Sequence, residues 1–381
     1  MPQENKKKER VKKMIKFGKW VVKFRIPILI LSFLLLIPTG IIYMNTRINY
    51  DILSYLPGDI ETMKGQDILL DEFGTGAFSV AVIDGMQEKE ISQLEDKLKE
   101  IDHVKDVLWY GALADISIPM DMLPDDLKDS LQNADTGSQL MIITFDTSMS
   151  ADETLDAIEE IRGLTNEQCL LSGMSAVVTD IKKICNSEVI MYVVIAAGLS
   201  ALVLALTMDS FLLPFIFLLS IGMAIVYNLG TNFIAGEISF VTQALAAVLQ
   251  LAVTMDYSIF LWHSYLENQE RYPDDKKRAM SHAISQTLTS VVGSSITTIA
   301  GFLAMCFMTF TLGMDLGIVM AKGVVFGVVG CVTILPAMIL AMDKWIEKTR
   351  HKAIIPDLGR IGGFVTKHYW IFIILFLVII G

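Results

Sequence analysis

The chain has 381 residues, of which 53% are hydrophobic and 19% charged, and its formal net charge is −11. This hydrophobic fraction is too high for an ordinary soluble enzyme and predicts a polytopic membrane protein. The acidic balance also argues against a nucleic-acid partner.

Six runs of about twenty apolar residues predict membrane-spanning helices. These runs are 26–43, 189–206, 211–229, 238–262, 288–310 and 316–342, and a seventh begins near Tyr369 and stops at Gly381. No small-residue cleavage site follows the first run, which we interpret as a retained anchor. Residues 1–25 before it mix basic residues with Trp, Phe and Val. This segment either lies on the inner-leaflet surface as an amphipathic helix or only sets the topology.

The distribution of Lys and Arg orients the predicted spans. Of the 31 basic residues, ten lie in 1–25, four in 264–282 and six in 343–368, whereas 231–237 and 311–315 contain none. Because cytoplasmic loops carry the basic excess, we expect a plasma-membrane protein with a cytoplasmic amino terminus. Residues 46–187 would then be extracytoplasmic. They hold 28 acidic and ten basic residues, which indicates a solvated domain that contacts cations.

Strand and helix signals alternate within the outer segment 46–187. The predicted order is strand 77–83, helix 88–101, strand 104–110, a looser stretch around 118–132, strand 139–145, a helix from about Ser150, and strand 169–171. Two such β-α-β units predict a four-stranded, ferredoxin-like α+β domain with its helices on one face. The next helix, from about Ser175, is predicted to continue directly into the second span.

The expected fold is therefore an all-α transmembrane bundle with one α+β extracytoplasmic domain between its first and second spans. Its predicted parts are a basic segment 1–25, a first span 26–45, the outer domain 46–187, spans two to six at 188–342, a cytoplasmic linker 343–368 and the start of a seventh span at 369–381.

No motif for catalysis, a metal or a cofactor is evident in the outer domain. His103 is its lone histidine, and HExxH, CxxC and GxSxG patterns are missing from the sequence of this segment. We therefore expect no enzyme, no cofactor and no metal site. Cys169 and Cys185 are both predicted to lie outside the membrane, where their spacing leaves open whether they form a disulfide. Cys306 and Cys331 are expected to be packing residues within spans.

A carboxylate and a phenol, Asp256 and Tyr257, stand side by side in the fourth predicted span. A charged side chain near the centre of a spanning helix costs about 2.5–3.5 kcal/mol, so Asp256 is expected to face protein or a wet cavity. There it would either carry protons or merely satisfy a helix interface. His263 follows seven residues later near the same helical face. It is either a proton exit or an interfacial histidine.

Lys322 is the second ionisable residue within the predicted hydrocarbon region. It lies about 9 Å from the outer face, whereas Asp256 lies about 27 Å from that face, so we expect no direct contact between them. Lys322 is expected to pair with Asp315, seven residues earlier, or to extend outward. Hydroxyl residues of the fifth span, Ser294 and Ser295 among them, either permit close helix packing or bond a neighbouring carboxyl group.

Segments of four predicted spans together resemble one known family. They are Thr254-Met-Asp-Tyr-Ser-Ile-Phe-Leu261, Met208-Asp-Ser-Phe-Leu-Leu-Pro214, Ser294-Ser-Ile-Thr-Thr-Ile-Ala-Gly-Phe-Leu303 and Leu316-Gly-Ile-Val-Met-Ala-Lys-Gly323 with Leu335-Pro-Ala337. The combination is similar to the mycobacterial membrane protein large (MMPL) family of the resistance-nodulation-division (RND) transporter superfamily, and it covers most of residues 20–342.

This resemblance implies a proton-driven exporter of hydrophobic or amphiphilic molecules, such as lipids or drugs, with a porter-type outer domain. Asp256 would carry the proton and Tyr257 would be its hydrogen-bond partner, with Ser294 or Ser295 facing the pair. Lys322 matches a position without an assigned role, and Asp209 departs from the basic residue found in many relatives. The implied partners are protons, membrane lipids, the transported molecule and a second transporter half.

The resemblance also implies two homologous halves. The segment 21–29 aligns with 365–373 at an offset of 344, so we expect a second half to begin near residue 365. Thirteen residues of the seventh span give about 20 Å of helix, short of the roughly 30 Å hydrocarbon core. We expect either an incomplete chain or a half-transporter that pairs with another half. Two other classes stay open: a lipid-sensing or scaffold protein without transport, and an RND relative that assists polypeptide translocation.

Overall fold

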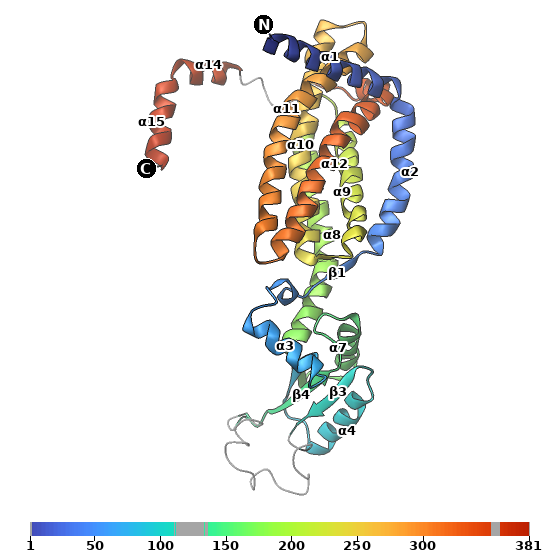
Figure 1. The fold of residues 1–381 in the computed structure, drawn as a ribbon, viewed down its shortest axis with the longest axis vertical. Helices are drawn as coiled ribbons and strands as arrows, with labels where there is room; N and C mark the ends of the chain where they lie inside the picture. Colours follow the sequence, from blue (N-terminus) through green and yellow to red (C-terminus); the bar gives the residue numbers. More distant parts are fainter. Residues whose placement is uncertain (1, 110, 112–132, 134–135, 352–358, 381) are drawn as a thin grey trace.

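The computed structural model describes residues 2–109, 111, 133, 136–351 and 359–380. A bundle of long helices forms one end of the molecule and a smaller α+β domain forms the other (Figure 1). The two parts are joined by α8 and by the chain that follows α2.

Within the part of the chain that the structure describes, six helices are long and apolar enough to cross a membrane, as the sequence predicts. They are α2 (Arg25–Met44), α8 (Met174–Thr207), α9 (Leu213–Gly230), α10 (Phe240–Arg271), α11 (Lys276–Ala304) and α12 (Leu312–Ala341). The chain is thus a multi-pass membrane protein. Helices α10 and α11 extend beyond the predicted spans because their polar ends stay helical on both sides of the short connection 272–275.

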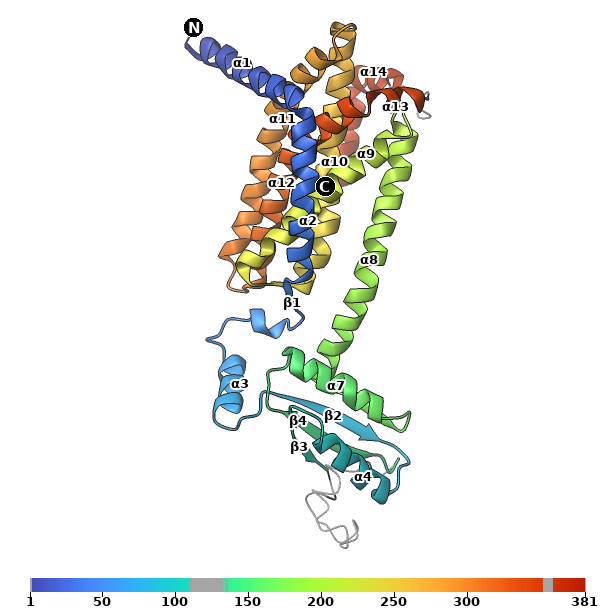
Figure 2. The same ribbon diagram turned by 90° about the vertical axis from the view of Figure 1, so that its right-hand side faces the viewer.

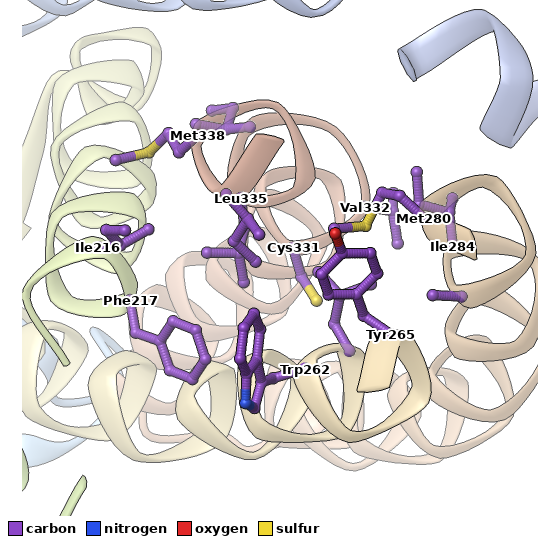
Figure 3. Packing of buried hydrophobic residues seen from close by; sticks show 14 of the residues in the cluster. Ile216, Phe217, Trp262, Tyr265, Met280, Ile284, Cys331, Val332, Leu335 and Met338 are labelled. Atoms are coloured by element: carbon purple, nitrogen blue, oxygen red, sulfur yellow. The ribbon is translucent and has the colours of Figure 1, made fainter. Parts of the chain in front are cut away.

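The bundle core lies between α9, α10, α11 and α12 (Figure 3). Phe217 of α9 and Leu335 of α12 are fully buried, and Trp262 of α10 is 4% exposed beside them. Burying a large apolar side chain of this kind contributes about 1.5–3 kcal/mol. These contacts fix the rotation of α10 about its axis and therefore decide which of its residues face outward.

The amino-terminal helix α1 (Pro2–Lys23) packs against α11 and then bends at Phe24 into α2 (Figure 2). Val21 and Val22 near its end belong to the bundle core. The predicted basic segment is therefore a docked helix at one end of the bundle.

The outer domain begins with β1 (Arg47–Asn49), the short helix η1 (Leu53–Tyr55) and α3 (Glu61–Asp71). Its main body contains β2 (Ala77–Ile83), α4 (Glu88–Lys99), β3 (Val104–Leu108), β4 (Gln139–Phe145), α7 (Asp152–Leu164) and β5 (Cys169–Ser172). The predicted strands and helices are present within two residues of their expected limits. The looser stretch expected around 118–132 lies outside the described residues.

The main sheet has the strand order β3-β4-β2-β5, and each neighbouring pair is antiparallel. Ala81 on β2 lies opposite Met141 on β4, and both are buried. Alternate residues of each strand point to this face. Leu98 of α4 and Ile158 of α7 belong to the same hydrophobic core, so both helices cover one face of the sheet.

Helix α8 connects the two parts without a break, as expected. Val178 near its start packs in the core of the outer domain, and Leu204 near its end packs in the core of the bundle. Its 34 residues correspond to about 51 Å of helix. A second connection is the parallel pairing of β1 with β6 (Glu237–Ser239), which directly precedes α10.

Short elements complete the fold: η3 (Thr231–Ala235), η4 (Met305–Phe307), α13 (Asp343–Lys348), α14 (Gly359–Lys367) and α15 (Tyr369–Ile380). Helix α15 contains the apolar run predicted as the start of a seventh span. Cys169 and Cys185 are both free thiols, so the disulfide left open by the sequence is not formed.

Candidate functional site

Helix α10 carries the acidic residue on which the sequence-based hypothesis depends. The helix begins after Ser239, whose hydroxyl accepts the backbone N–H of Val241 at 3.2 Å. Asp256 lies midway along the helix and its side chain is exposed. Within the described part of the chain it has no hydrogen-bond or ion-pair partner. The carboxyl group is therefore directed away from the core of this bundle.

Tyr257 faces the opposite environment. It is 6% exposed and belongs to the bundle core, where its backbone carbonyl accepts the thiol of Cys331. Successive residues of a helix are rotated by about 100°, so neighbours in sequence do not face each other. No hydrogen bond joins Asp256 and Tyr257 among the described residues. Their partnership in a proton relay stays a prediction.

Asp256 belongs to an exposed stripe on α10. Ala252, Asp256, Phe260 and His263 recur at spacings of four, four and three residues, and all four are exposed. This spacing places them on one helical face. His263 thus lies on the same face as Asp256, as expected, but it too has no hydrogen-bond partner within the described residues.

The two candidate serines of α11 differ in environment. Ser294 is exposed, whereas Ser295 is 3% exposed and its hydroxyl has no hydrogen-bond partner in the structure. Neither forms a hydrogen bond with Asp256 among the residues that the structure describes. That Ser294 or Ser295 faces Asp256 stays a prediction. The Ser295 hydroxyl is thus buried and still able to form a hydrogen bond.

Lys322 lies in a cavity of about 420 Å³ at the end of the bundle next to the outer domain. Its ammonium group donates a hydrogen bond to Asn232. As expected, no ion pair joins Lys322 to Asp256 among the residues that the structure describes. Apolar side chains of α12, including Met314 and Ile318, line the same cavity and give it an amphipathic character.

Of the two arrangements expected for Lys322, an ion pair with Asp315 is not formed among the described residues. Asp315 also lines the cavity, but its Oδ2 accepts the backbone N–H of Ser239 at 2.8 Å and the hydroxyl of Thr242 at 2.6 Å. Unpaired N–H groups and the positive end of the helix dipole make a helix amino terminus a favourable site for a carboxylate. Asp315 therefore fixes the start of α10.

Tyr55 of η1, in the outer domain, also lines the cavity. Burial raises the pKa of its phenol, and the nearby carboxylates of Asp315 and Glu237 raise it further. The phenol therefore stays protonated at neutral pH and is able to donate a hydrogen bond.

Two buried amides in the bundle were not singled out from the sequence. Asn228 of α9 is fully buried, and its Nδ2 donates to Oε1 of Gln250 on α10 at 3.0 Å. Asn228 Oδ1, Gln250 Nε2 and Asn232 Nδ2 have no partner in the structure. Amide side chains within apolar spans are the sequence signal that would have identified them.

Asn228 and Gln250 lie against Gly323 of α12, the residue after Lys322. Gln250 precedes Asp256 by six residues, about 9 Å along the helix. Thr254 lies between them, is 3% exposed and has an unpartnered hydroxyl. Polar groups thus occur at successive depths from Lys322 to the level of Asp256. Among the described residues, no cluster of three or more His, Cys, Asp or Glu side chains is placed to hold a metal.

A family model described as the MMPL family matches residues 74–368. A protein of Streptomyces coelicolor named as a membrane protein is 25% identical over 239 residues, covering 60% of this chain and 28% of the relative. A protein of Mycobacterium tuberculosis named as the probable transport protein MmpL12 is 24% identical over 299 residues, covering 74% of this chain and 24% of the relative.

Among solved structures, the chain is similar to SecDF, described as a translocon-associated membrane protein from Thermus thermophilus. The TM-score is 0.47 at 15% identity, covering 85% of this chain and 38% of that chain. The chain spans about a quarter of the length of the two sequence relatives. Because the family model matches most of the residues, including α8 to α12 and the helix that carries Asp256, this chain belongs to the MMPL family.

Proposed function

We propose that this chain forms one half of an RND-type transporter that exports hydrophobic or amphiphilic molecules at the expense of a proton gradient. Asp256 is the proton carrier, and the single observation that supports this role most strongly is its position. It is an exposed, unpartnered carboxyl group midway along a helix of a multi-pass membrane protein.

The position of Asp256 implies a protein partner on the exposed face of α10. A carboxylate against acyl chains would cost about 2.5–3.5 kcal/mol or more, so lipid alone does not explain an acid here. A second transporter half, either another copy or a separate half, would cover the stripe that contains Asp256 and His263. Side chains from that half would complete the surroundings in which the carboxyl group gains and loses its proton.

The buried polar groups support a route for protons. Asn228, Gln250 and Thr254 retain unpartnered donors or acceptors between the cavity at Lys322 and the level of Asp256. Buried polar atoms of this kind are commonly satisfied by ordered water. Water held by these groups would connect the extracytoplasmic side to Asp256, with Tyr257 and Ser295 as further hydroxyl groups near the relay.

The transported molecule is expected to meet the protein at the amphipathic cavity and the outer domain. We assign this domain a ferredoxin-like fold, which the strand order β3-β4-β2-β5 supports. Its assigned role is that of a porter domain, which handles the transported molecule. The continuous helix α8 would couple its movement to the bundle. This assignment places the amino terminus in the cytoplasm and 46–187 outside the plasma membrane, in agreement with the distribution of basic residues.

Substitution of Asp256 tests the proposal. The transporter is reconstituted in vesicles with an imposed pH gradient, and proton flux is followed when a fluorescent phosphatidylethanolamine or ethidium is added. Asp256→Asn should abolish probe-dependent flux and gradient-driven probe movement, whereas Asp256→Glu should retain part of both. Glu267→Gln removes an exposed acid from the same helix and should have no effect. Unchanged transport by Asp256→Asn would reject proton coupling, and binding of the lipid probe without any transport would favour a lipid sensor.

A further inference from the structure

A second cavity, of about 560 Å³, is lined by residues of α1, α2 and α11 and of the connection that precedes α11. These segments lie at the end of the bundle opposite the outer domain (Figure 2). The cavity is formed where α1 bends into α2 and where α11 begins (Figure 2). Five basic side chains line it: Lys19, Lys23, Arg25, Lys277 and Arg278. We call this cavity the basic cleft.

Close packing holds the walls of the basic cleft in place. A Cβ atom built on Gly18 of α1 would lie 2.4 Å from the backbone oxygen of Ser281 on α11, so only glycine permits this approach. Val21 is fully buried in the bundle core one turn later. Lys19 and Lys23 therefore project from a helix fixed against α11, and the cleft is part of the folded bundle.

Among the described residues, carboxylates do not balance the positive charge of the basic cleft. Its lining includes one acidic residue, Asp275, whose Oδ1 accepts the backbone N–H of Arg278 at 2.9 Å. No ion pair joins any of the five basic residues to a carboxylate in the described part of the chain. The Nε of Arg25 is buried without a hydrogen-bond partner. A guanidinium N–H among like charges is a favourable donor to an anionic group.

The surroundings of the cleft indicate which anion is bound. Three apolar residues of α1 and α2 are close in sequence to the basic residues of the cleft. They are Trp20, Ile26 and Ile30, and their side chains are about half exposed or more. Such apolar surface next to a basic site suits a molecule with a phosphate head and acyl chains. Arg and Lys side chains supply the charge-assisted hydrogen bonds that phosphate oxygens accept.

We propose that the basic cleft is a specific binding site for the phosphate group of an anionic phospholipid at the membrane surface. The bound head group would bridge α1, α2 and α11 and relieve the repulsion among their basic side chains. This inference does not depend on transport activity or on Asp256.

Binding to the purified full chain tests the proposal. A short-chain phosphatidylglycerol is titrated into the detergent-solubilised protein and detected by native mass spectrometry. The double variant Lys23→Gln/Lys277→Gln removes two charges from the cleft. The matched control Lys12→Gln/Lys16→Gln removes two charges from exposed positions of α1 outside it. The cleft variant should bind at least about tenfold more weakly, whereas the control should change binding by less than about twofold.

Two further measurements keep the result interpretable. Thermal unfolding establishes that both variants are folded, and inorganic phosphate in a competition arm distinguishes a lipid site from a site for free phosphate. Equal loss of binding in both variants would overturn the proposal, because the lipid would then respond to total charge. Inorganic phosphate binding as tightly as the lipid would overturn the assignment of a phospholipid.

Discussion

Gly327 of α12 faces Thr254 of α10 so closely that a Cβ atom built on Gly327 would lie 2.5 Å from the Thr254 hydroxyl oxygen. The backbone of α12 therefore packs directly against the Thr254 side chain of α10, two residues before Asp256. Glycine at this position allows the approach that orients α10. Gly323, one turn earlier on α12, packs in the same way on the amides of Asn228 and Gln250. Close packing of α12 on its neighbours therefore explains the sequence pattern Gly323-x-x-x-Gly327.

We predict that Gly327→Ala destabilises the bundle. The added methyl group must displace Thr254 or push α12 away from α10, and such overpacking typically costs about 1–3 kcal/mol. A lower thermal unfolding temperature of the purified protein would report the loss. Gly222→Ala on α9 is the matched control because nothing lies within 4 Å of its Cβ position. Equal stability of the two variants would contradict the close contact.

In the outer domain, Glu95 of α4 is the buried acceptor for two donors. It accepts the indole N–H of Trp109, which is 1% exposed, and the ammonium group of Lys99 at 2.6 Å. Glu95→Ala should destabilise this domain by about 1–3 kcal/mol, because the buried indole N–H loses its acceptor. Glu95→Gln keeps an acceptor oxygen and should cost less.

The measurement for Glu95 is chemical denaturation of the full chain followed by tryptophan fluorescence. Lys99→Gln serves as the control, since Lys99 is half exposed and its ion pair is expected to contribute less than about 1 kcal/mol. If Lys99→Gln were as damaging as Glu95→Ala, the ion pair rather than the buried hydrogen bond would be the stabilising contact.

The elements of the fold were largely predictable because their signals are local. Apolar runs identified the six spans, and the alternation of strand and helix patterns identified β2 to β5. The direction of Asp256 was not predictable in the same way. Every face of α10 near Asp256 includes apolar residues, so periodicity does not determine its rotation. Packing of Trp262 and Tyr257 against α9 and α12 determines it.

Polar contacts between residues far apart in the sequence were the second feature that the sequence did not predict. Depth along the helices correctly separated Lys322 from Asp256. The spacing of seven residues offered an ion pair with Asp315 as one of two arrangements for Lys322, whereas Asp315 bonds the start of α10 and Lys322 bonds Asn232. Both bonds join residues more than seventy positions apart, and no local pattern encodes such distances.

The two outer cysteines should react separately with thiol reagents. Burial raises the pKa of Cys169, which is 4% exposed, so little thiolate is present at neutral pH. Cys185 is only partly buried and should be labelled faster by a maleimide in the native protein. Mass spectrometry after labelling in denaturant without a reductant should find both thiols modified. A persistent mass deficit of two labels that disappears after reduction would reveal a disulfide instead.

Asp209 has a structural role in the connection between α8 and α9. Its Oδ1 accepts the indole N–H of Trp262 at 3.1 Å, and its Oδ2 lies 3.0 Å from Arg350 Nη2. The exposed ion pair with Arg350 should contribute less than about 1 kcal/mol. The bond to Trp262 should matter more, because Trp262 is 4% exposed and its N–H would otherwise be buried without an acceptor.

Three variants separate these two contributions. Asp209→Ala should lower the stability of the bundle by about 1–3 kcal/mol, because it removes the acceptor of Trp262. Asp209→Asn keeps an acceptor oxygen, and Arg350→Gln removes only the charge partner, so each should change stability by less than about 1 kcal/mol. Thermal unfolding of the purified chain measures all three. If Arg350→Gln matched Asp209→Ala, the ion pair would be the dominant contact. If Asp209→Ala left the unfolding temperature unchanged, the contact with Trp262 would not position α10.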